Sequence, residues 1–371
     1  MTHTRREKTA RLMVAASERD ADMLYATRFM APDAFIWWEW KGITKIAINR
    51  LEIDRARKEA RVDEVLPIES FPTKDVAKII HQIALKEKFK RIEVPRHFPH
   101  GLAVQLEQLG IQVVAKKESL FFHSREIKTA DEVKAITRAQ RMAEAGLFRA
   151  IEVLRESSIA KNKKLIWQGR PLTSERLRGE IESTIVKLGG LPSGTIVAGG
   201  VQACDPHERG HGPLKAHESI IIDIFPRETR SGYFGDLTRT VVRGRASEAL
   251  RELFHLVKEA QSLALNKMKP GVDGKTIHEE IEELFKKRGY PTELRQGRWV
   301  GFFHGTGHSL GLEIHESPRF SAAHFRPGHI MTVEPGLYYP EIGGVRIEDV
   351  VQITNEGVRN LTRAAKTLEI V

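Results

Sequence analysis

Five short segments in the C-terminal half of the chain each place one carboxylate or one imidazole in a distinctive setting. These residues are Asp223 in IIIDIF, Asp236 in GYFGDLTRT, His308 in HGTGHSLGLEIHE, Glu334 in TVEPGLYYP and Glu348 in GGVRIEDVV. Four carboxylates and one imidazole form an oxygen-rich set that can hold two divalent metal ions, and such paired ions support hydrolysis by activated water. Any fold assigned to this chain therefore has to bring five distant segments to one place.

The two aspartates fall on what the sequence predicts to be a β-hairpin. Residues 220–222 and 237–242 supply apolar strands, and residues 226–232 supply the turn. Asp223 and Asp236 would then lie on paired strands and could point at one site. Taken alone, each aspartate is better explained as a strand-end residue in a turn, so the hairpin gains its functional meaning from the other three segments.

The remaining segments combine histidines, glycines and acidic residues. His304, His308 and His315 lie among glycines that permit unusual backbone angles and close approach, so loop and strand are expected here rather than a zinc-binding helix. In VRIEDVV, strand alternation puts Arg346 and Glu348 on one face. An ion pair with Arg346 would be an ordinary structural explanation for Glu348 taken alone.

The N-terminal part of the chain alternates strands with helices, which predicts a small α/β domain. Residues 33–49 are typical of two strands joined by a turn at Lys41 and Gly42. Residues 75–90 have apolar residues at helical spacing behind a cap at Asp75. The motif WWEW, residues 37–40, indicates core packing in a strand.

The rest of the chain opens with a long helix that Thr129 or Asp131 could cap. We place the domain boundary at residue 125, which gives domains of residues 1–125 and 126–371. The second domain shows a weak internal echo, because the order helix, helix, strands occurs twice. The two aspartates belong to the first half and the other three candidate ligands to the second, which predicts a site between pseudo-symmetric halves.

Charge and composition limit the classes of partner that the chain is expected to bind. The net charge is +10, but basic residues are interspersed with acidic ones and no nucleic-acid-binding signature is present, so no nucleic-acid partner is expected. No apolar run approaches the roughly 20 residues that span a bilayer, and no membrane association is expected. Cys204 is the single cysteine of the 371-residue chain, which fits a reducing, cytoplasmic location.

The five segments resemble those of the pita-bread metallopeptidases, the family of methionine aminopeptidase, aminopeptidase P and prolidase. The family's metal ligands match Asp223, Asp236, His308, Glu334 and Glu348 in this chain. The resemblance is strong over residues 126–371, and residues 1–125 resemble the N-terminal domain of the creatinase and prolidase branch. It implies an α/β (α+β) protein in which a smaller α/β domain precedes a pita-bread domain of two pseudo-symmetric helix-helix-strand halves.

The same resemblance implies an activity. The chain would be an Xaa-Pro dipeptidase (prolidase) or an aminopeptidase P that hydrolyses the Xaa-Pro bond at the N-terminus of short proline-containing peptides. The attack would come from a hydroxide bridging two divalent metal ions. Manganese is the first choice, with cobalt, iron or zinc as alternatives, and the implied assembly is a homodimer. His304 marks this branch, because methionine aminopeptidases generally lack a histidine four residues before the ligand histidine.

Further residues receive roles from the resemblance. Glu334 would be both a metal ligand and a proton shuttle. His315 and His207 would stabilise the tetrahedral oxyanion or the leaving nitrogen. His304 and Arg346 would line the pocket on the proline side and orient the substrate.

Two features depart from the family pattern or leave a choice open. The interval between Asp223 and Asp236 is two residues longer than usual, and Phe225 stands where the family commonly has glycine. An even insertion preserves the face that each strand residue uses, so both aspartates can still converge. His207, in GGVQACDPH, is the preferred upstream histidine, and His211 is its competitor four residues later.

Two other functions fit parts of the sequence. A creatinase-like amide hydrolase that works without metal predicts the loss of ligands, and none of the five is lost. A non-catalytic pita-bread module that binds protein or nucleic acid could use the basic charge and the WWEW motif. Such a module has no chemical reason to keep four carboxylates and a histidine converging on one site.

Overall fold

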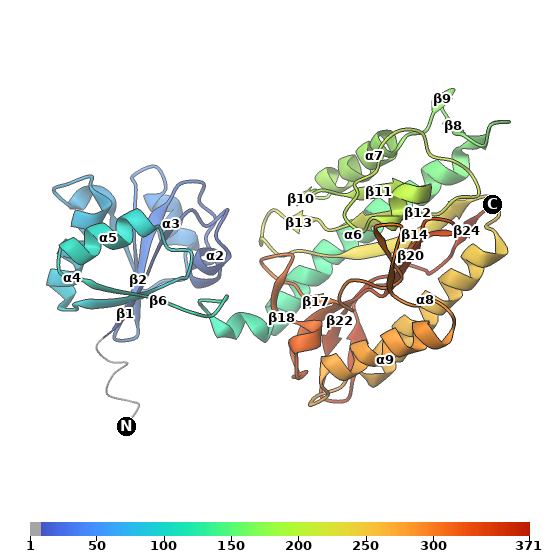
Figure 1. The fold of residues 1–371 in the computed structure, drawn as a ribbon. Helices are drawn as coiled ribbons and strands as arrows, with labels where there is room; N and C mark the ends of the chain where they lie inside the picture. Colours follow the sequence, from blue (N-terminus) through green and yellow to red (C-terminus); the bar gives the residue numbers. More distant parts are fainter. Residues whose placement is uncertain (1–8) are drawn as a thin grey trace. The chain divides into compact units, whose positions relative to one another are not determined.

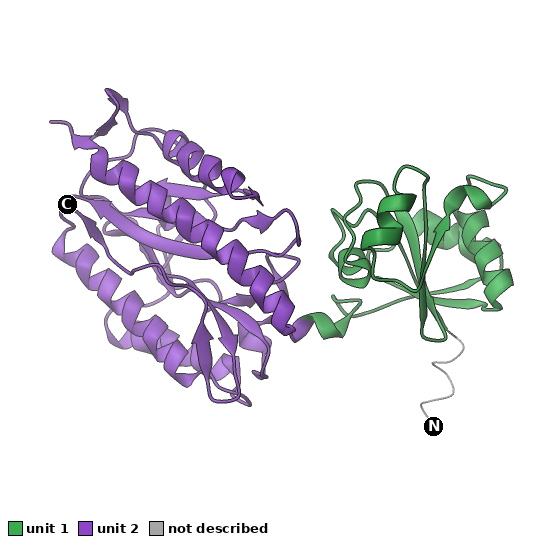
Figure 2. Cartoon of the chain, turned by 180° about the vertical axis from the view of Figure 1, so that it is seen from behind, with its two compact units in different colours: residues 1–125 green, residues 126–371 purple. Residues whose placement is uncertain are grey.

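The computed structural model describes residues 9–371. The chain divides into two compact units, Met1–Arg125 and Glu126–Val371 (Figure 2). Among the described residues no helix is both long and apolar enough to cross a bilayer. Each unit has its own buried apolar core.

Unit 1 is a six-stranded sheet in the order β4-β3-β2-β1-β5-β6 with helices packed against it (Figure 1). The predicted hairpin is present, and its turn at Lys41 and Gly42 has positive φ angles of 53° and 78°. Asp75 caps its helix through a bond from the Lys78 amide, as predicted. The elements are β1 Ala10–Ala15, α2 Ala21–Thr27, β2 Phe35–Trp40, β3 Ile43–Ile48, α3 Ile53–Glu59, β4 Glu64–Pro67, η1 Ile68–Ser70, α4 Val76–Glu87, β5 Arg91–Val94, α5 His100–Gln108, β6 Gln112–Ala115 and η2 His123–Glu126.

The WWEW motif packs in this core, as the strand pattern indicates. Trp37 and Trp38 alternate along β2, so they enter two different apolar clusters on opposite faces of the sheet. Each is only 1% exposed. These tryptophans therefore stabilise unit 1 and are not available as a binding surface.

Unit 2 begins with a long helix whose start is fixed by a capping box. Thr129 accepts from the Glu132 amide, and the Glu132 carboxylate accepts from the Thr129 amide in return. The first half then runs through α6 Ala130–Glu156, β7 Ser158–Ile159, β8 Leu165–Trp167, β9 Arg170–Pro171, α7 Ser174–Lys187, β10 Gly190–Leu191, β11 Ile196–Gly199, η3 Gly200–Cys204, β12 Ile220–Ile224, β13 Arg227–Glu228 and β14 Leu237–Arg243. Helices α6 and α7 bury their apolar faces against β11, β12 and β14.

The second half repeats this order with a second helix pair. Its elements are α8 Glu248–Lys267, α9 Gly274–Lys287, β15 Glu293–Arg295, β16 Arg298–Val300, β17 His308–Ser309, β18 Glu316–Arg319, η4 Phe320–Ala322, β19 Ile330–Val333, β20 Gly336–Tyr339, β21 Gly343–Arg346, β22 Asp349–Ile353, β23 Val358–Asn360 and β24 Glu369–Ile370. The last strand, β24, pairs in parallel with β14 and thereby becomes part of the sheet of the first half. Helices α8 and α9 pack against β19, β21 and β22 (Figure 1).

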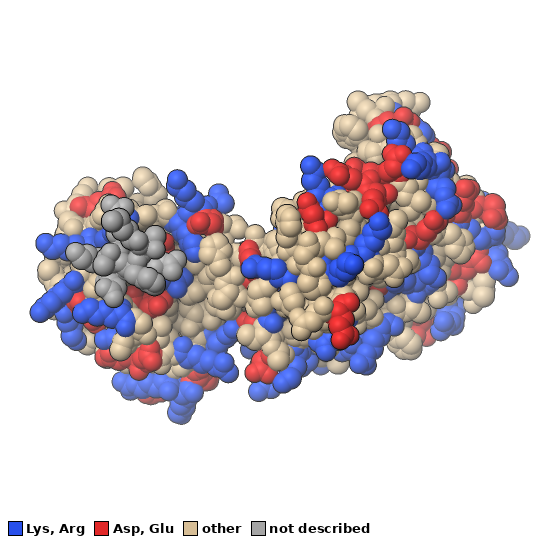
Figure 3. Space-filling model, turned by 90° about the horizontal axis from the view of Figure 1, so that it is seen from below, with Lys and Arg blue, Asp and Glu red and all other residues tan. Residues whose placement is uncertain are grey.

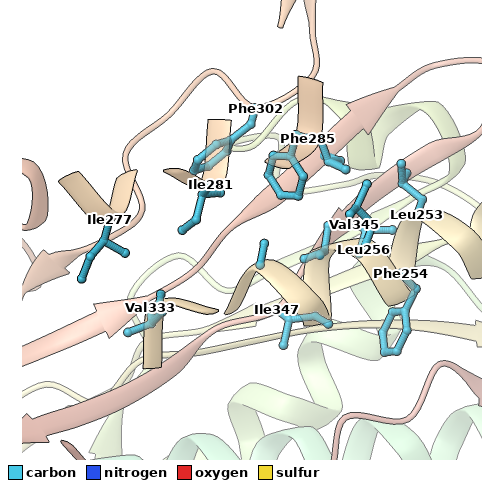
Figure 4. Close-up of a cluster of buried hydrophobic side chains, with 14 of the residues drawn as sticks. Leu253, Phe254, Leu256, Ile277, Ile281, Phe285, Phe302, Val333, Val345 and Ile347 are labelled. Carbon is cyan, nitrogen blue, oxygen red and sulfur yellow. The ribbon is translucent and has the colours of Figure 1, made fainter. Parts of the chain in front are cut away.

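The core of the second half sets the direction of two acidic side chains. Val333 and Ile347 point into an apolar cluster with residues of α8 and α9 (Figure 4). Successive residues in extended chain point to opposite sides. Glu334 and Glu348, which directly follow them, are therefore directed away from the helices.

The surface carries charges of both signs. Lys and Arg are interspersed with Asp and Glu across the face drawn in Figure 3, which agrees with the mixed charge pattern of the sequence. This face has no continuous basic stripe of the kind that tracks a phosphate backbone.

Candidate metal centre

The hairpin of the first half places its two aspartates on one face. Strands β12 and β14 pair antiparallel, with Asp223 opposite Thr238 and Ile224 opposite Leu237. Asp236 lies two residues before Thr238, so the alternation of side chains puts it on the same face as Asp223. Both the hairpin and the convergence of its two aspartates on one site were predicted from the sequence.

The second half brings its three residues to the same place through different strands. Glu334 directly follows β19, and Glu348 directly precedes β22, which pairs with β19. His308 begins β17, and its amide donates to Thr332 Oγ1 at 3.0 Å. Thr332 Oγ1 in turn donates to Glu334 Oε1 at 3.0 Å.

Thr238 joins the two halves across the pocket. Its hydroxyl donates to Glu348 Oε2 at 2.7 Å, and its carbonyl accepts from the Glu348 amide at 3.0 Å. The first half therefore fixes an acidic residue of the second.

The predicted ligands meet in a largely buried cluster. His308 Nε2 lies 3.3 Å from Glu334 Oε1 and 3.7 Å from Asp236 Oδ2. One ligand atom each from Asp236, His308 and Glu348 lie within 4.8 Å of one another. Asp223 Oδ2 accepts from Arg346 Nη2 at 2.7 Å, while its buried Oδ1 has no hydrogen-bond partner.

The electrostatics of this cluster call for a cation. Burial, followed by the neighbouring carboxylates, raises the pKa of Asp236 and Glu348 well above the usual range. Burial is also the main reason that the pKa of Glu334 rises to about 7. Burial lowers the pKa of His308 to about 4, so its imidazole is neutral, as a metal ligand has to be.

The orientation of the His308 ring also leaves one ring nitrogen available to bind a metal ion. Its Nδ1 faces the Ser309 carbonyl at 3.2 Å, which places the ring proton there and leaves the Nε2 lone pair for the carboxylate side. Together with the orphaned Asp223 oxygen and the crowded carboxylates, this donor set fits divalent metal ions.

A hydrogen-bonded chain leads from Asp223 to His304. Arg346 donates to Asp223, and its Nη1 donates to the Tyr338 hydroxyl at 3.1 Å. His304 Nδ1 faces the Gly305 carbonyl at 2.9 Å, so His304 Nε2 accepts from the Tyr338 hydroxyl at 2.8 Å. Burial is the largest cause that lowers the pKa of His304 to about 3.

Two further histidines lie at the open side of the cluster. His315 is exposed, and its ring meets that of His308 edge-on, with ring centroids 4.4 Å apart. His207 is exposed as well, and its charge lowers the pKa of Glu334, His304 and His315. The structure thus brings all the predicted site residues into one neighbourhood.

The competing histidine lies elsewhere. The amide of His211 donates to Gln202 Oε1 at 2.9 Å, and its ring lies 3.7 Å from Glu208. These contacts hold His211 on an exposed loop. Of the two candidates, His207 is the one that interacts with the cluster.

The longer hairpin connection is an ordered part of the fold. It forms β13, which pairs antiparallel with β10. Glu228 of this strand is buried and forms a two-pronged ion pair with Arg138 of α6, with distances of 2.6 and 3.0 Å. The extra residues therefore pack against the first half and leave the register of Asp223 and Asp236 intact.

Sequence reasoning missed the side chains that hold the site together. Thr238, Thr332 and Tyr338 orient Glu348, Glu334 and His304 respectively. All three lie within or next to the segments singled out in the sequence. Thr332 lies two residues from Glu334 and could have been suspected from strand alternation, whereas the partners of Tyr338 and Thr238 are 34 and 110 residues away and carry no local sign.

Gly235→Ala should disturb the cluster through the backbone. A Cβ atom at Gly235 would lie 2.6 Å from the main-chain carbon of Ala139 and from the amide nitrogen of Gln140, both in α6. Helix backbone cannot yield, so the hairpin has to move and carry Asp236 with it. We expect a loss of about 1–3 kcal/mol in unfolding free energy and weaker manganese binding, measured by urea denaturation and calorimetry.

The matched control is Gly179→Ala in α7. A Cβ atom there meets nothing within 4 Å, so this variant should gain about 0.5–1 kcal/mol with unchanged manganese affinity. If the two variants behave alike, the close approach of Gly235 to α6 has no role.

The fold and the carboxylate pocket together define the class as a pita-bread metallohydrolase. Residues 134–355 match the model of metallopeptidase family M24, and the chain belongs to this family. The family and the fold expected from the sequence are thereby confirmed.

Individual relatives agree with this placement. The chain is 29% identical to the Xaa-Pro dipeptidase of Pyrococcus horikoshii over 329 residues, which cover 86% of this chain and 84% of that protein. It is 31% identical to the Xaa-Pro dipeptidase of Pyrococcus furiosus over 269 residues, covering 71% and 70%.

Solved structures extend the likeness to nearly the whole chain. The crystal structure of the prolidase from Pyrococcus horikoshii superposes with a TM-score of 0.81 at 25% identity, covering 98% of this chain and 96% of that one. The X-Pro aminopeptidase from Thermotoga maritima superposes with a TM-score of 0.84 at 23% identity, covering 98% and 97%, and shares the fold.

Proposed function

We propose that the protein is a dinuclear-metal peptidase that hydrolyses the Xaa-Pro bond at the N-terminus of short peptides. The observation that supports this proposal is the clustering of Asp236, His308 and Glu348, with Glu334 and Asp223 beside them. The similarity to Xaa-Pro dipeptidases over most of the chain supplies the substrate class. By resemblance, the assembly would be a cytoplasmic homodimer.

Five residues would hold the metal ions. They are Asp223, Asp236, His308, Glu334 and Glu348. Two divalent ions, with manganese as the first choice, would supply Lewis-acid activation of a water molecule near neutral pH. Carboxylate oxygens with one imidazole are ligands that suit manganese. Structural zinc sites, by contrast, are typically rich in cysteine sulfur.

The side chains at the open side would carry the proton transfers and orient the peptide. Glu334 is partly open to solvent, with 16% of its side chain exposed, so its carboxylate can accept a proton from the attacking water and pass it to the leaving nitrogen. His315 and His207 are exposed beside it and would donate hydrogen bonds to the tetrahedral oxyanion or to the leaving nitrogen. His304 would line the proline side of the pocket.

Arg346 would act through other residues. It is 3% exposed and already donates to Asp223 and Tyr338. We therefore propose that Arg346 orients the substrate indirectly, by fixing Asp223 and the Tyr338–His304 pair. The carboxylate of a bound dipeptide would need another cation.

Hydrolysis of Ala-Pro and Ala-Pro-Ala by metal-stripped protein, with and without added manganese, tests the proposed function. Release of alanine from Ala-Pro alone would identify a dipeptidase, and release from Ala-Pro-Ala would identify an aminopeptidase P. We expect manganese to be required in either case. Cleavage of neither peptide with manganese, cobalt, iron or zinc would refute the proposal. That result would favour a binding module or another amide substrate.

A further inference from the structure

Two buried glutamines occupy corresponding helices of the two halves. Gln140 lies on α6, the first helix of the first half, and Gln261 lies on α8, the first helix of the second. Both side chains are fully buried. A buried amide has to be hydrogen-bonded to be tolerated, and the partners of these two amides are the backbone segments that carry candidate metal ligands.

Gln140 forms hydrogen bonds with both main-chain polar groups of Asp236. Its Nε2 donates to the Asp236 carbonyl at 2.8 Å, and its Oε1 accepts from the Asp236 amide at 2.9 Å. The same Nε2 donates to Thr362 Oγ1 at 3.0 Å, and that hydroxyl accepts from the Val350 amide at 2.9 Å. Gln140 thereby links Asp236 to the strand that follows Glu348.

Gln261 bridges the segments of the two glutamates. Its Nε2 donates to the Val333 carbonyl at 2.8 Å and to the Ile347 carbonyl at 3.1 Å. One side-chain amide thus ties together the residues that directly precede Glu334 and Glu348. Its Oε1 is buried without a hydrogen-bond partner. An unpartnered buried oxygen is unfavourable, and the two bonds that the NH₂ group donates offset this cost.

The acidic residues of these segments lie at the ends of strands or between them. Asp236 directly precedes β14, Glu334 directly follows β19, and Glu348 lies between β21 and β22. The Glu334 and Glu348 amides donate to the carbonyls of Thr306 and Thr238, and the two glutamines add bonds to these segments and to Asp236 from the helix side. These added bonds hold the backbones of the acidic residues at a fixed spacing where their side chains are crowded together.

We propose that Gln140 and Gln261 are positioning residues that preset the spacing of Asp236, Glu334 and Glu348 before metal binds. This inference rests on the proposed metal-dependent function. Helices α6 and α8 then each fix the ligand segments through one glutamine. The spacing of these acidic residues is therefore set in the metal-free protein.

The test uses Gln140→Met and Gln261→Met, which keep the length of the side chain and remove its hydrogen bonds. Manganese affinity is measured by calorimetry, and amide hydrogen exchange is measured on the metal-free protein. We expect manganese affinity to fall by about 10–100-fold, the range seen when partners of metal ligands are lost. Exchange at the Asp236 amide should accelerate in Gln140→Met, and in peptides that contain Glu334 and Glu348 in Gln261→Met.

Controls on the same helices separate positioning from stability. Leu147→Ala on α6 and Val257→Ala on α8 remove buried apolar groups without removing a hydrogen bond to the ligand segments. They should lower the melting temperature and leave manganese affinity unchanged. If the glutamine variants match these controls in affinity and in local exchange, the positioning role is refuted.

Kinetics add an independent readout. With manganese at saturation, the methionine variants should recover most of kcat with little change in KM for Ala-Pro, because their defect lies in metal capture. A wild-type protein that binds manganese but cleaves neither peptide would refute the proposed substrate. The affinity and exchange comparisons would still decide the role of the glutamines in that case.

Discussion

Asp236→Asn is expected to lower kcat/KM for the cleaved Xaa-Pro peptide by about 1,000-fold or more, the scale on which a centre that works as a unit fails when one member is removed. Asp236 lies within 4.8 Å of ligand atoms of His308 and Glu348, and its own side chain is almost fully buried. Asparagine keeps the shape and removes the charge that divalent ions require. Kinetic assays at several manganese concentrations measure the loss.

The same variant should affect stability in the opposite direction. Burial and the charges of Asp223 and Glu334 disfavour an ionised Asp236 in the metal-free protein. Its replacement relieves this repulsion, so the melting temperature without metal should stay the same or rise. We expect manganese to raise the melting temperature of the wild-type protein and to leave that of this variant unchanged.

The exposed variant Asp54→Asn, in unit 1, controls for the loss of a carboxylate and should match the wild type in both assays, because its side chain is 85% exposed. Full activity in both Asp236→Asn and Glu334→Ala would contradict the assignment of the metal centre.

Arg239→Met should cause the largest loss of stability, about 3–5 kcal/mol, which is typical when one partner of a buried ion pair is removed. Arg239 is 2% exposed and pairs with the buried Asp349 at 2.8 Å. It also donates to the carbonyls of Thr238, Glu348, Ala364 and Ala365. Methionine fills the volume but leaves these acceptors without their donor. Urea denaturation measures the change.

Lys366 also contacts Asp349, at 2.7 Å, so the carboxylate keeps one cation and the variant should still fold. Arg295→Met is the matched control, because Arg295 forms ion pairs with Glu293 and Glu341 at the surface. Such exposed pairs contribute about 1 kcal/mol or less. A loss of that size in Arg239→Met would show that the buried pair adds little.

The sequence allowed the five candidate ligands to be predicted because each sits in a local string with its own signature. Strand periodicity was enough to put Asp223 and Asp236 on one face, and the register confirms it. The packing of the WWEW motif and the cap at Asp75 also followed from local pattern and chemistry. These features depend on residues that are neighbours in the chain.

The residues that sequence reasoning missed depend on contacts between distant segments. Tyr338 carries no local sign that it will bridge Arg346 and His304, since strand packing alone brings them together. Gln140 and Gln261 look like ordinary polar residues on amphipathic helices, and only the closed fold gives them backbone partners 72 to 96 residues away. His207 and His211 lie in one loop, and only its path distinguishes them.

The parallel pairing of β24 with β14 has a consequence for biosynthesis. Val242 lies opposite Glu369, so the sheet that carries Asp223 and Asp236 cannot close until the ribosome has translated both strands. At about 5–20 residues per second, this delay is on the order of ten seconds. At the start of that interval the nascent chain holds two of the five candidate ligands, Asp223 and Asp236, so a complete metal centre has to wait for the second half of unit 2.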